Sequence, residues 1–138
     1  MTGADAARLA RETLVLHDAT AAWFVANKLG PYGLEELQEL TTDRDAQVLR
    51  AAGVGDAAAF VAARRRFLSD LLGVAARVED GVLVVEDCPL PAEAERWGLT
   101  AALWCAGCRR YTASLARKLG VSVAHSQESP GACRLGEA

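Results

Sequence analysis

The residues of this chain with the clearest capacity for chemistry are its four cysteines, Cys88, Cys105, Cys108 and Cys133. Cys105 and Cys108 are three positions apart in a segment that we expect to be helical, so both thiols would lie on one face about one turn apart. Tetrahedral zinc sites commonly combine such a Cys-x-x-Cys pair with ligands from distant segments. Cys88 and Cys133 are candidates for the distant ligands. The pattern therefore predicts a four-cysteine metal site, with zinc as the expected metal.

Three alternatives to zinc stay open. Cysteine thiolates also hold [4Fe-4S] clusters, and Cys88 is followed by a proline, as some cluster ligands are. The segment Trp104-Cys105-Ala106-Gly107-Cys108 resembles the Trp-Cys-x-x-Cys signature of thioredoxin-like dithiol oxidoreductases, although no apolar strand precedes it. Free cysteines are also often small buried apolar residues, an interpretation that suits one cysteine better than four.

Composition limits the class of protein. The chain has 138 residues, which fits one domain, and its 51% apolar and 24% charged residues exclude a disordered chain. A net charge of −3 argues against nucleic acid as a partner. No apolar run approaches the ~20 residues of a membrane span, and the charged residues within 1–16 argue against a signal peptide. We expect a cytoplasmic protein, and a reducing compartment favours metal binding over disulfides.

The first half of the chain is expected to be helical. Up to Leu72 it is rich in alanine and poor in glycine and proline, and its apolar residues recur at intervals of three and four. Expected helix starts are Thr2, in a capping box with Asp5, then Asp43 after a short amphipathic piece at 34–40, and Asp56. Expected stops are at Gly30, Gly53 and Gly73. The last helix should bury Phe60, Val61, Phe67, Leu68 and Leu71 and expose Arg64, Arg65 and Arg66.

The pattern changes near residue 74. Residues 74–78 and 82–86 are typical of a hairpin with an Asp-Gly turn, a helix is expected at 101–119 after Thr100, and strands are expected at 121–127 and 133–135. We therefore predict a single α+β domain over residues 1–138. N-terminal helices, about 4–72, are followed by a cysteine-containing part, about 74–136, in which one long helix crosses a small antiparallel sheet.

Several motifs resemble a known bacterial family. These are Glu86-Asp87-Cys88-Pro89, the Cys-x-x-Cys helix that ends at Leu119-Gly120, and Gly131-Ala132-Cys133-Arg134-Leu135. They are similar to the L-2-amino-thiazoline-4-carboxylic acid hydrolase-like family and, more distantly, to the 4-vinyl reductase small-molecule-binding domain. His17-Asp18, followed by Trp23-Phe24 and Leu29-Gly30, is similar to the helix that opens those proteins.

The resemblance implies a cytosolic domain with a cysteine cluster, a small-molecule ligand and hydrolysis of a cyclic C–N bond. It makes His17 and Asp18 the candidate catalytic residues, whereas His125, which alternates in an expected strand, is interpreted as structural or at the surface. Zinc held by four cysteines has no open position, while three cysteines would leave room for a reactive hydroxide. A non-catalytic small-molecule-binding or sensor module stays open as the alternative. Pairing of two chains through exposed apolar helix faces also stays open.

Overall fold

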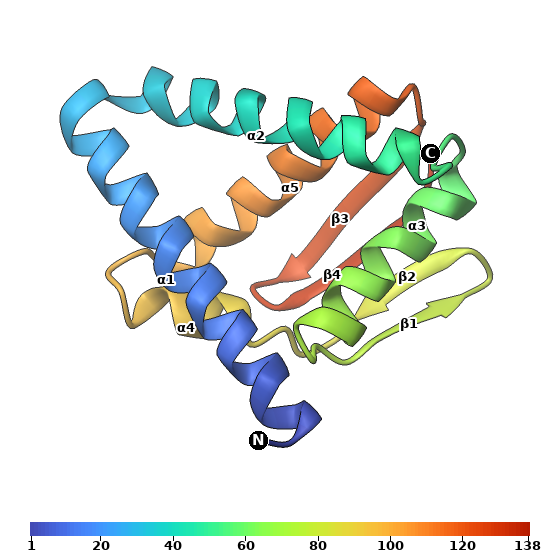
Figure 1. Ribbon diagram of the computed structural model, residues 1–138, viewed down its shortest axis with the longest axis horizontal. Helices are drawn as coiled ribbons and strands as arrows, with labels where there is room; N and C mark the ends of the chain where they lie inside the picture. The colour runs from blue at the N-terminus through green and yellow to red at the C-terminus, as the bar shows by residue number, and fades with distance from the viewer.

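The computed structural model describes the backbone of residues 1–138 and all side chains except those of Ala26 and Pro31. The first part of the chain is helical, and the second part combines four strands with two further helices, as expected for an α+β protein (Figure 1). The elements are α1 (Gly3–Leu29), α2 (Pro31–Ala51), α3 (Ala57–Arg66), the π-helix η1 (Phe67–Leu71), β1 (Ala76–Glu79), β2 (Val82–Val85), α4 (Leu90–Glu95), α5 (Ala101–Leu119), β3 (Val123–Ser129) and β4 (Ala132–Glu137).

The four strands form one antiparallel sheet in the order β1-β2-β4-β3. The expected Asp-Gly turn joins β1 to β2, and both of its residues have positive φ values, 49° at Asp80 and 77° at Gly81. This is the backbone conformation that a two-residue type I′ hairpin turn requires. The last strand, β4, enters the sheet between β2 and β3, so it joins the hairpin to the C-terminal half of the chain.

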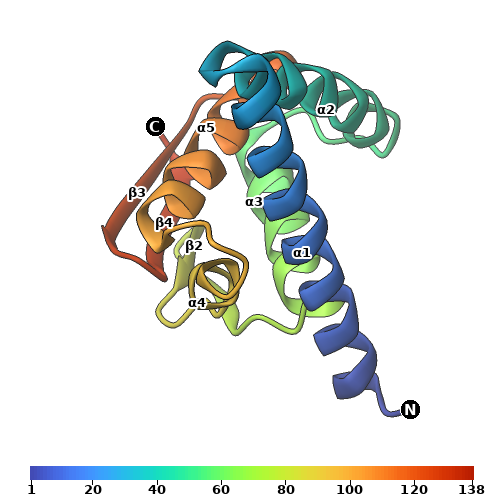
Figure 2. The ribbon, with the colours of Figure 1, turned by 90° about the vertical axis from the view of Figure 1, so that its left-hand side faces the viewer.

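Helices cover the sheet in two layers. The α3 helix packs against β1, β2 and β4, and α5 packs against β3. The α1 helix contacts α2, α4 and η1, and α2 contacts α5. In Figure 2 the sheet lies on one side of the molecule and α1 on the other, with α3 and α5 between them. The space between α3, α5 and the sheet is therefore enclosed by elements from both halves of the chain.

The α2 helix corrects one sequence prediction. A helix was expected to begin at Asp43, but α2 runs without a break through this position. The hydroxyls of Thr41 and Thr42 donate to backbone carbonyls one turn earlier, each at 2.9 Å, so these residues are accommodated inside the helix. Asp43 caps no helix. It forms an ion pair with Lys118 of α5 at 2.8 Å.

The end of the third helix also differs from the expectation. After Arg66 the chain continues as a π-helix, closed by a hydrogen bond from the Leu72 N–H to the Phe67 carbonyl oxygen at 3.2 Å. The wider turn shifts which residues face the core. Leu72 is 1% exposed and Leu71 is 53% exposed, so the expected burial of Leu71 is wrong. Phe60, Val61 and Leu68 are buried as predicted.

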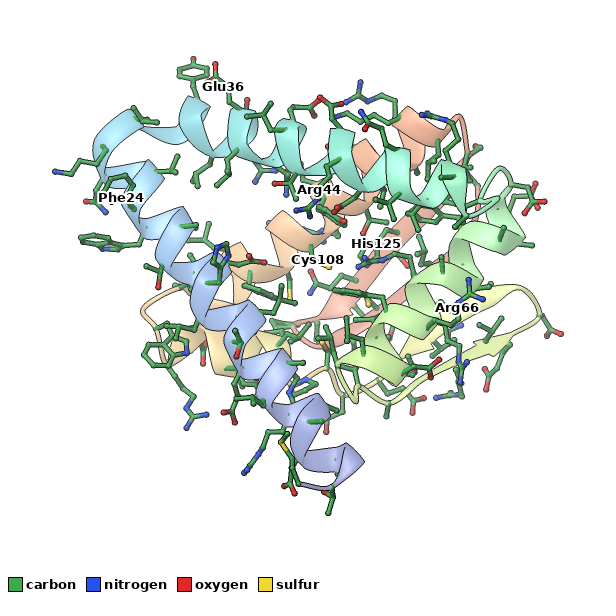
Figure 3. The ribbon with its side chains drawn as sticks, viewed as in Figure 1. Phe24, Glu36, Arg44, Arg66, Cys108 and His125 are labelled. Atoms are coloured by element: carbon green, nitrogen blue, oxygen red, sulfur yellow. The ribbon has the colours of Figure 1, made fainter. Side chains whose placement is uncertain are left out.

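Large apolar side chains are exposed where α1 meets α2. They include Trp23, Phe24, Leu29 and Tyr32, and Figure 3 shows Phe24 pointing away from the molecule. In the part of the chain that the structure describes, no helix has the length and apolar character that a membrane span requires.

A partly buried ion pair fixes α1 against the second half of the chain. The Arg11 Nε donates to Glu93 Oε1 of α4 at 2.7 Å, and its Nη1 donates to the Leu72 carbonyl oxygen at 2.9 Å. The side chains are 16% and 12% exposed. Because Leu72 follows the π-helix and Glu93 belongs to α4, this single guanidinium joins three segments.

We expect Arg11→Met to lower the free energy of unfolding by about 2–3 kcal/mol, because it leaves the Glu93 carboxylate buried without its cation. Urea unfolding measures the effect. Arg8→Met is the matched control, since the Arg8 side chain is 64% exposed and lies 3.9 Å from Asp5. Equal losses in the two variants would contradict this account of Arg11.

Candidate metal centre

A small cavity lies between α3, α5 and the inner face of the sheet. Its volume is about 50 Å³, and its lining is mostly apolar. Cys88, Cys105, Cys108 and Cys133 all line it. The structure therefore brings the four cysteines that the sequence singled out to one place, although they come from three separate segments.

Two of the cysteines are positioned by α5. The hydroxyl of Thr100 accepts a hydrogen bond from the Leu103 N–H at 3.2 Å and caps the helix at its expected start. Cys105 and Cys108, one turn apart, then face the cavity together. Cys105 is 8% exposed and Cys108 is half-buried. The prediction that the Cys-x-x-Cys pair lies on a helix is confirmed.

Cys133 is positioned by strand register. In β4 it lies opposite Val85 of β2 and opposite Gln127 of β3. All three side chains line the cavity. Because side chains alternate between the faces of a sheet, a shift of one residue would move the Cys133 thiol to the other face.

Cys88 is positioned by the turn between β3 and β4. Its N–H donates to the Gly131 carbonyl oxygen at 2.9 Å. Gly131 has φ 91°, and a Cβ atom added there would lie 3.2 Å from the Cys88 carbonyl oxygen. The turn thus needs glycine both for its backbone conformation and for its close approach to the Cys88 loop. This contact holds Cys88 beside the strand that carries Cys133.

Burial keeps these thiols protonated. It raises the pKa of Cys88 to about 12 and that of Cys133 to about 11, and it also raises the pKa of Cys108. The other cysteines around the cavity add to the rise, because neighbouring negative charges would repel one another. Protonated thiols are weak nucleophiles and release a proton when a metal binds.

The four thiols have the chemistry of zinc ligands, but in this structure they lie too far apart to hold an ion together. Among the described side chains, no three from histidine, cysteine, aspartate or glutamate lie close enough to hold a metal ion. Four thiols nevertheless line one cavity with room for a single ion. The backbone of Leu90 opposes the rise in the pKa of Cys88 and so favours its thiolate.

Sequence reasoning missed two residues of the cavity, Arg64 and His125. Arg64 belongs to the arginine triplet that was expected to be solvated, yet it lines the cavity. His125 faces the cavity because β3 alternates and its neighbours in register, such as Leu135, point to the same side. Figure 3 shows Cys108 on α5 and His125 on β3 in the space between α5 and α3, whereas Arg66 points away from it. Strand alternation was the available signal for His125.

His125 is held neutral in this position. Burial and, to a smaller extent, the positive charges of Arg64 and Arg109 lower its pKa to about 4. Its buried Nδ1 has no hydrogen-bond partner among the described residues.

The structure does not bring His17 and Asp18 to the cavity. Both lie on α1 with exposed side chains, and neither lines the cavity. The His17 Nδ1 lies 3.3 Å from Asp18 Oδ1. Partial burial raises the pKa of Asp18, while the adjacent imidazole opposes the rise. Their catalytic role stays a prediction.

A larger hollow elsewhere offers no comparable chemistry. It has a volume of about 540 Å³ and is lined by Tyr32, Glu35, Glu36, Glu39 and Leu40. All five residues belong to the single helix α2. One helix cannot enclose a ligand on several sides, so this hollow is an open surface, and the cysteine cavity is the better candidate site.

No protein-family model matches this chain, and no match is found among curated proteins or solved structures. The resemblance to the thiazoline-carboxylate hydrolase-like family stays a prediction.

We expect the metal-free protein to lose stability as the pH falls from about 6.5 toward 4, in part through His125. Its pKa is lowered from 6.5 to about 4, so the neutral ring contributes stability above pH 6.5 that is lost as the pH falls through 4. After discounting for solvent screening, this contribution is about 1–2 kcal/mol. Urea unfolding at pH 7 and pH 4 measures the loss, which His125→Gln should reduce. His17→Gln, which replaces an exposed histidine, should leave this loss of stability between pH 7 and pH 4 unchanged. The same loss in the His125 variant as in the wild type would contradict the prediction.

Proposed function

We propose that this chain is a metal-binding domain in which Cys88, Cys105, Cys108 and Cys133 bind one zinc ion in a closed, four-thiolate site. One observation carries the proposal. The four cysteines of the chain, drawn from α5, β4 and the loop after β2, line the same cavity. Structural zinc sites use this arrangement, in which a Cys-x-x-Cys pair on one element meets cysteines from distant segments.

The size of the cavity supports an ion as its occupant. Pockets for small organic ligands usually have volumes of about 300–1,000 Å³, whereas this cavity has about 50 Å³. One water molecule occupies about 30 Å³ in the liquid, so the cavity has room for a single ion. A [4Fe-4S] core has eight atoms and would need more space. The volume thus favours zinc over a cluster and over a small-molecule substrate at this place.

A closed site would stabilise the folded chain. When bound, zinc would link α5, the loop that carries Cys88 and the strand that carries Cys133, and its binding free energy would add to folding. Each thiol that becomes a ligand loses its proton to solvent, so three thiols with raised pKa values imply tighter binding at higher pH. The proposal includes a cytoplasmic location, because a thiolate site needs reduced cysteines.

Two rival functions make different demands on the cysteines. A hydrolase acting on a cyclic C–N bond needs an open coordination position, and therefore no more than three protein ligands. A dithiol oxidoreductase that uses Cys105 and Cys108 needs both thiols free of metal and one of them with a lowered pKa, whereas burial raises the pKa of Cys108. Ligand number therefore separates the closed site from the hydrolase, and metal content separates it from the oxidoreductase.

The test is metal content in the wild type and in four single Cys→Ser variants, purified without oxygen or chelator. We expect one zinc ion per wild-type chain and no visible absorption. Each variant should lose its zinc to a competing chelator at a concentration at least about tenfold lower, because a hydroxyl replaces a thiolate ligand. Each should also unfold at a lower temperature than the zinc-loaded wild type.

Ala106→Ser is the control, because it introduces the same side chain next to Cys105 without removing a thiol. It should bind zinc as the wild type does. One cysteine variant with full zinc retention would contradict the closed site and favour a three-ligand hydrolase site. If the protein contains iron and shows broad visible absorption, the bound group is an iron–sulfur cluster and not zinc. No metal, with a reversible disulfide between Cys105 and Cys108, would favour the oxidoreductase.

A further inference from the structure

Two positive charges face the cavity without a negative partner. Arg64 of α3 and Arg109 of α5 both line it. Within the described part of the chain, no carboxylate oxygen lies within 4.0 Å of either guanidinium. The adjacent Arg65, by contrast, lies 3.9 Å from Asp70. Arg64 is half-buried, and a mostly apolar cavity is an unfavourable place for an unpaired cation, so its presence needs an explanation.

Arg64 is held in place by two aromatic rings. Its Cζ atom lies 5.2 Å from the centre of the Phe67 ring and 5.4 Å from that of Tyr111. The Tyr111 hydroxyl in turn donates to Asp45 Oδ2 at 2.5 Å. Phe67 is the first residue of the π-helix, and such distortions are frequent at functional sites. The half-buried Arg64 is therefore a fixed part of the cavity wall.

The two cations favour the thiolate forms of the cysteines that they face. The charges of Arg64 and Arg109 oppose the rise that burial causes in the pKa of Cys108, and Arg64 does the same at Cys133. His125, whose pKa the two arginines also lower, is neutral and brings no negative charge. With four neutral thiols, the two guanidiniums leave the cavity with a net positive charge.

The proposed metal group has the opposite charge. Four thiolates and one Zn²⁺ carry −4 + 2 = −2, and two guanidiniums carry +2. We propose that Arg64, assisted by Arg109, is the counter-charge that stabilises the four-thiolate metal group. This inference depends on the proposed function. Arg64 has the larger part, because it is less exposed than Arg109 and solvent screens it less.

A counter-charge stabilises the metal-bound state more than it stabilises the metal-free state. Arg64→Met keeps a long apolar side chain against Phe67 and Tyr111 but removes the charge. It should weaken zinc binding by about 10–100-fold, the usual range for residues that support metal ligands. Arg64→Lys keeps the charge but stacks less well on the two rings, so it should weaken zinc binding less than Arg64→Met does. Arg65→Met, which removes a neighbouring charge paired with Asp70, should bind zinc as the wild type does.

The experiment is chelator competition for zinc on the full chain, combined with thermal unfolding of the metal-free and zinc-loaded forms. We expect the Arg64→Met variant to lose most of the zinc-induced rise in unfolding temperature. Its metal-free form should unfold within a few degrees of the metal-free wild type. A residue important only for packing would lower both temperatures equally, and that result would overturn the proposal.

Two further outcomes would overturn it. Unchanged zinc affinity in Arg64→Met would do so, and so would equal weakening by Arg64→Lys and Arg64→Met.

If Arg64→Met does not fold, Arg109→Met decides, because Arg109 is exposed on α5 and its replacement leaves the core intact. It should weaken zinc binding several-fold at low salt and less at 1 M salt. If the wild type itself binds no zinc, the proposed function fails first, which is a separate result.

Discussion

The hydrogen bond from the Cys88 N–H to the Gly131 carbonyl oxygen is the contact on which the site depends. At 2.9 Å it joins the loop that leaves β2 to the turn that begins β4. The strand register then places Cys133 in the sheet beside this loop, and α5 crosses above with Cys105 and Cys108. Without this contact the Cys88 loop, which contains Pro89 and belongs to no strand, would have little to fix it against the sheet.

Burial and charge act in opposite directions at this site. The mostly apolar cavity raises the pKa values of Cys88, Cys108 and Cys133, which favours neutral thiols, while Arg64 and Arg109 favour thiolates. The conflict is unfavourable in the metal-free protein. A divalent ion bound by four thiolates would resolve it, because it supplies the negative group that the guanidiniums lack and adds coordination bonds. The same physical reasoning explains why a small cavity contains both cysteines and unpaired arginines.

The sequence predicted the parts of this arrangement that depend on local chemistry. Caps at Thr2, Asp56 and Thr100 and the turn at Asp80-Gly81 are confirmed, because each depends on residues within a few positions of one another. The Asp43 prediction was wrong, because the threonines before it satisfy their hydroxyls inside α2. Arg64 lies three and four positions after the buried Val61 and Phe60, on the same face of α3, and was misjudged because it was assigned to a solvated arginine triplet. Leu71 was misjudged for a different reason. A π-turn alters the face that a helix presents, and helical periodicity does not contain that information.

Sulfur coordination is the central claim, and X-ray absorption at the zinc edge of the wild-type protein tests it most directly. The account predicts four sulfur atoms at about 2.3 Å from zinc and no nitrogen or oxygen ligand. A first shell with three or fewer sulfur atoms would contradict it, as would a protein without zinc.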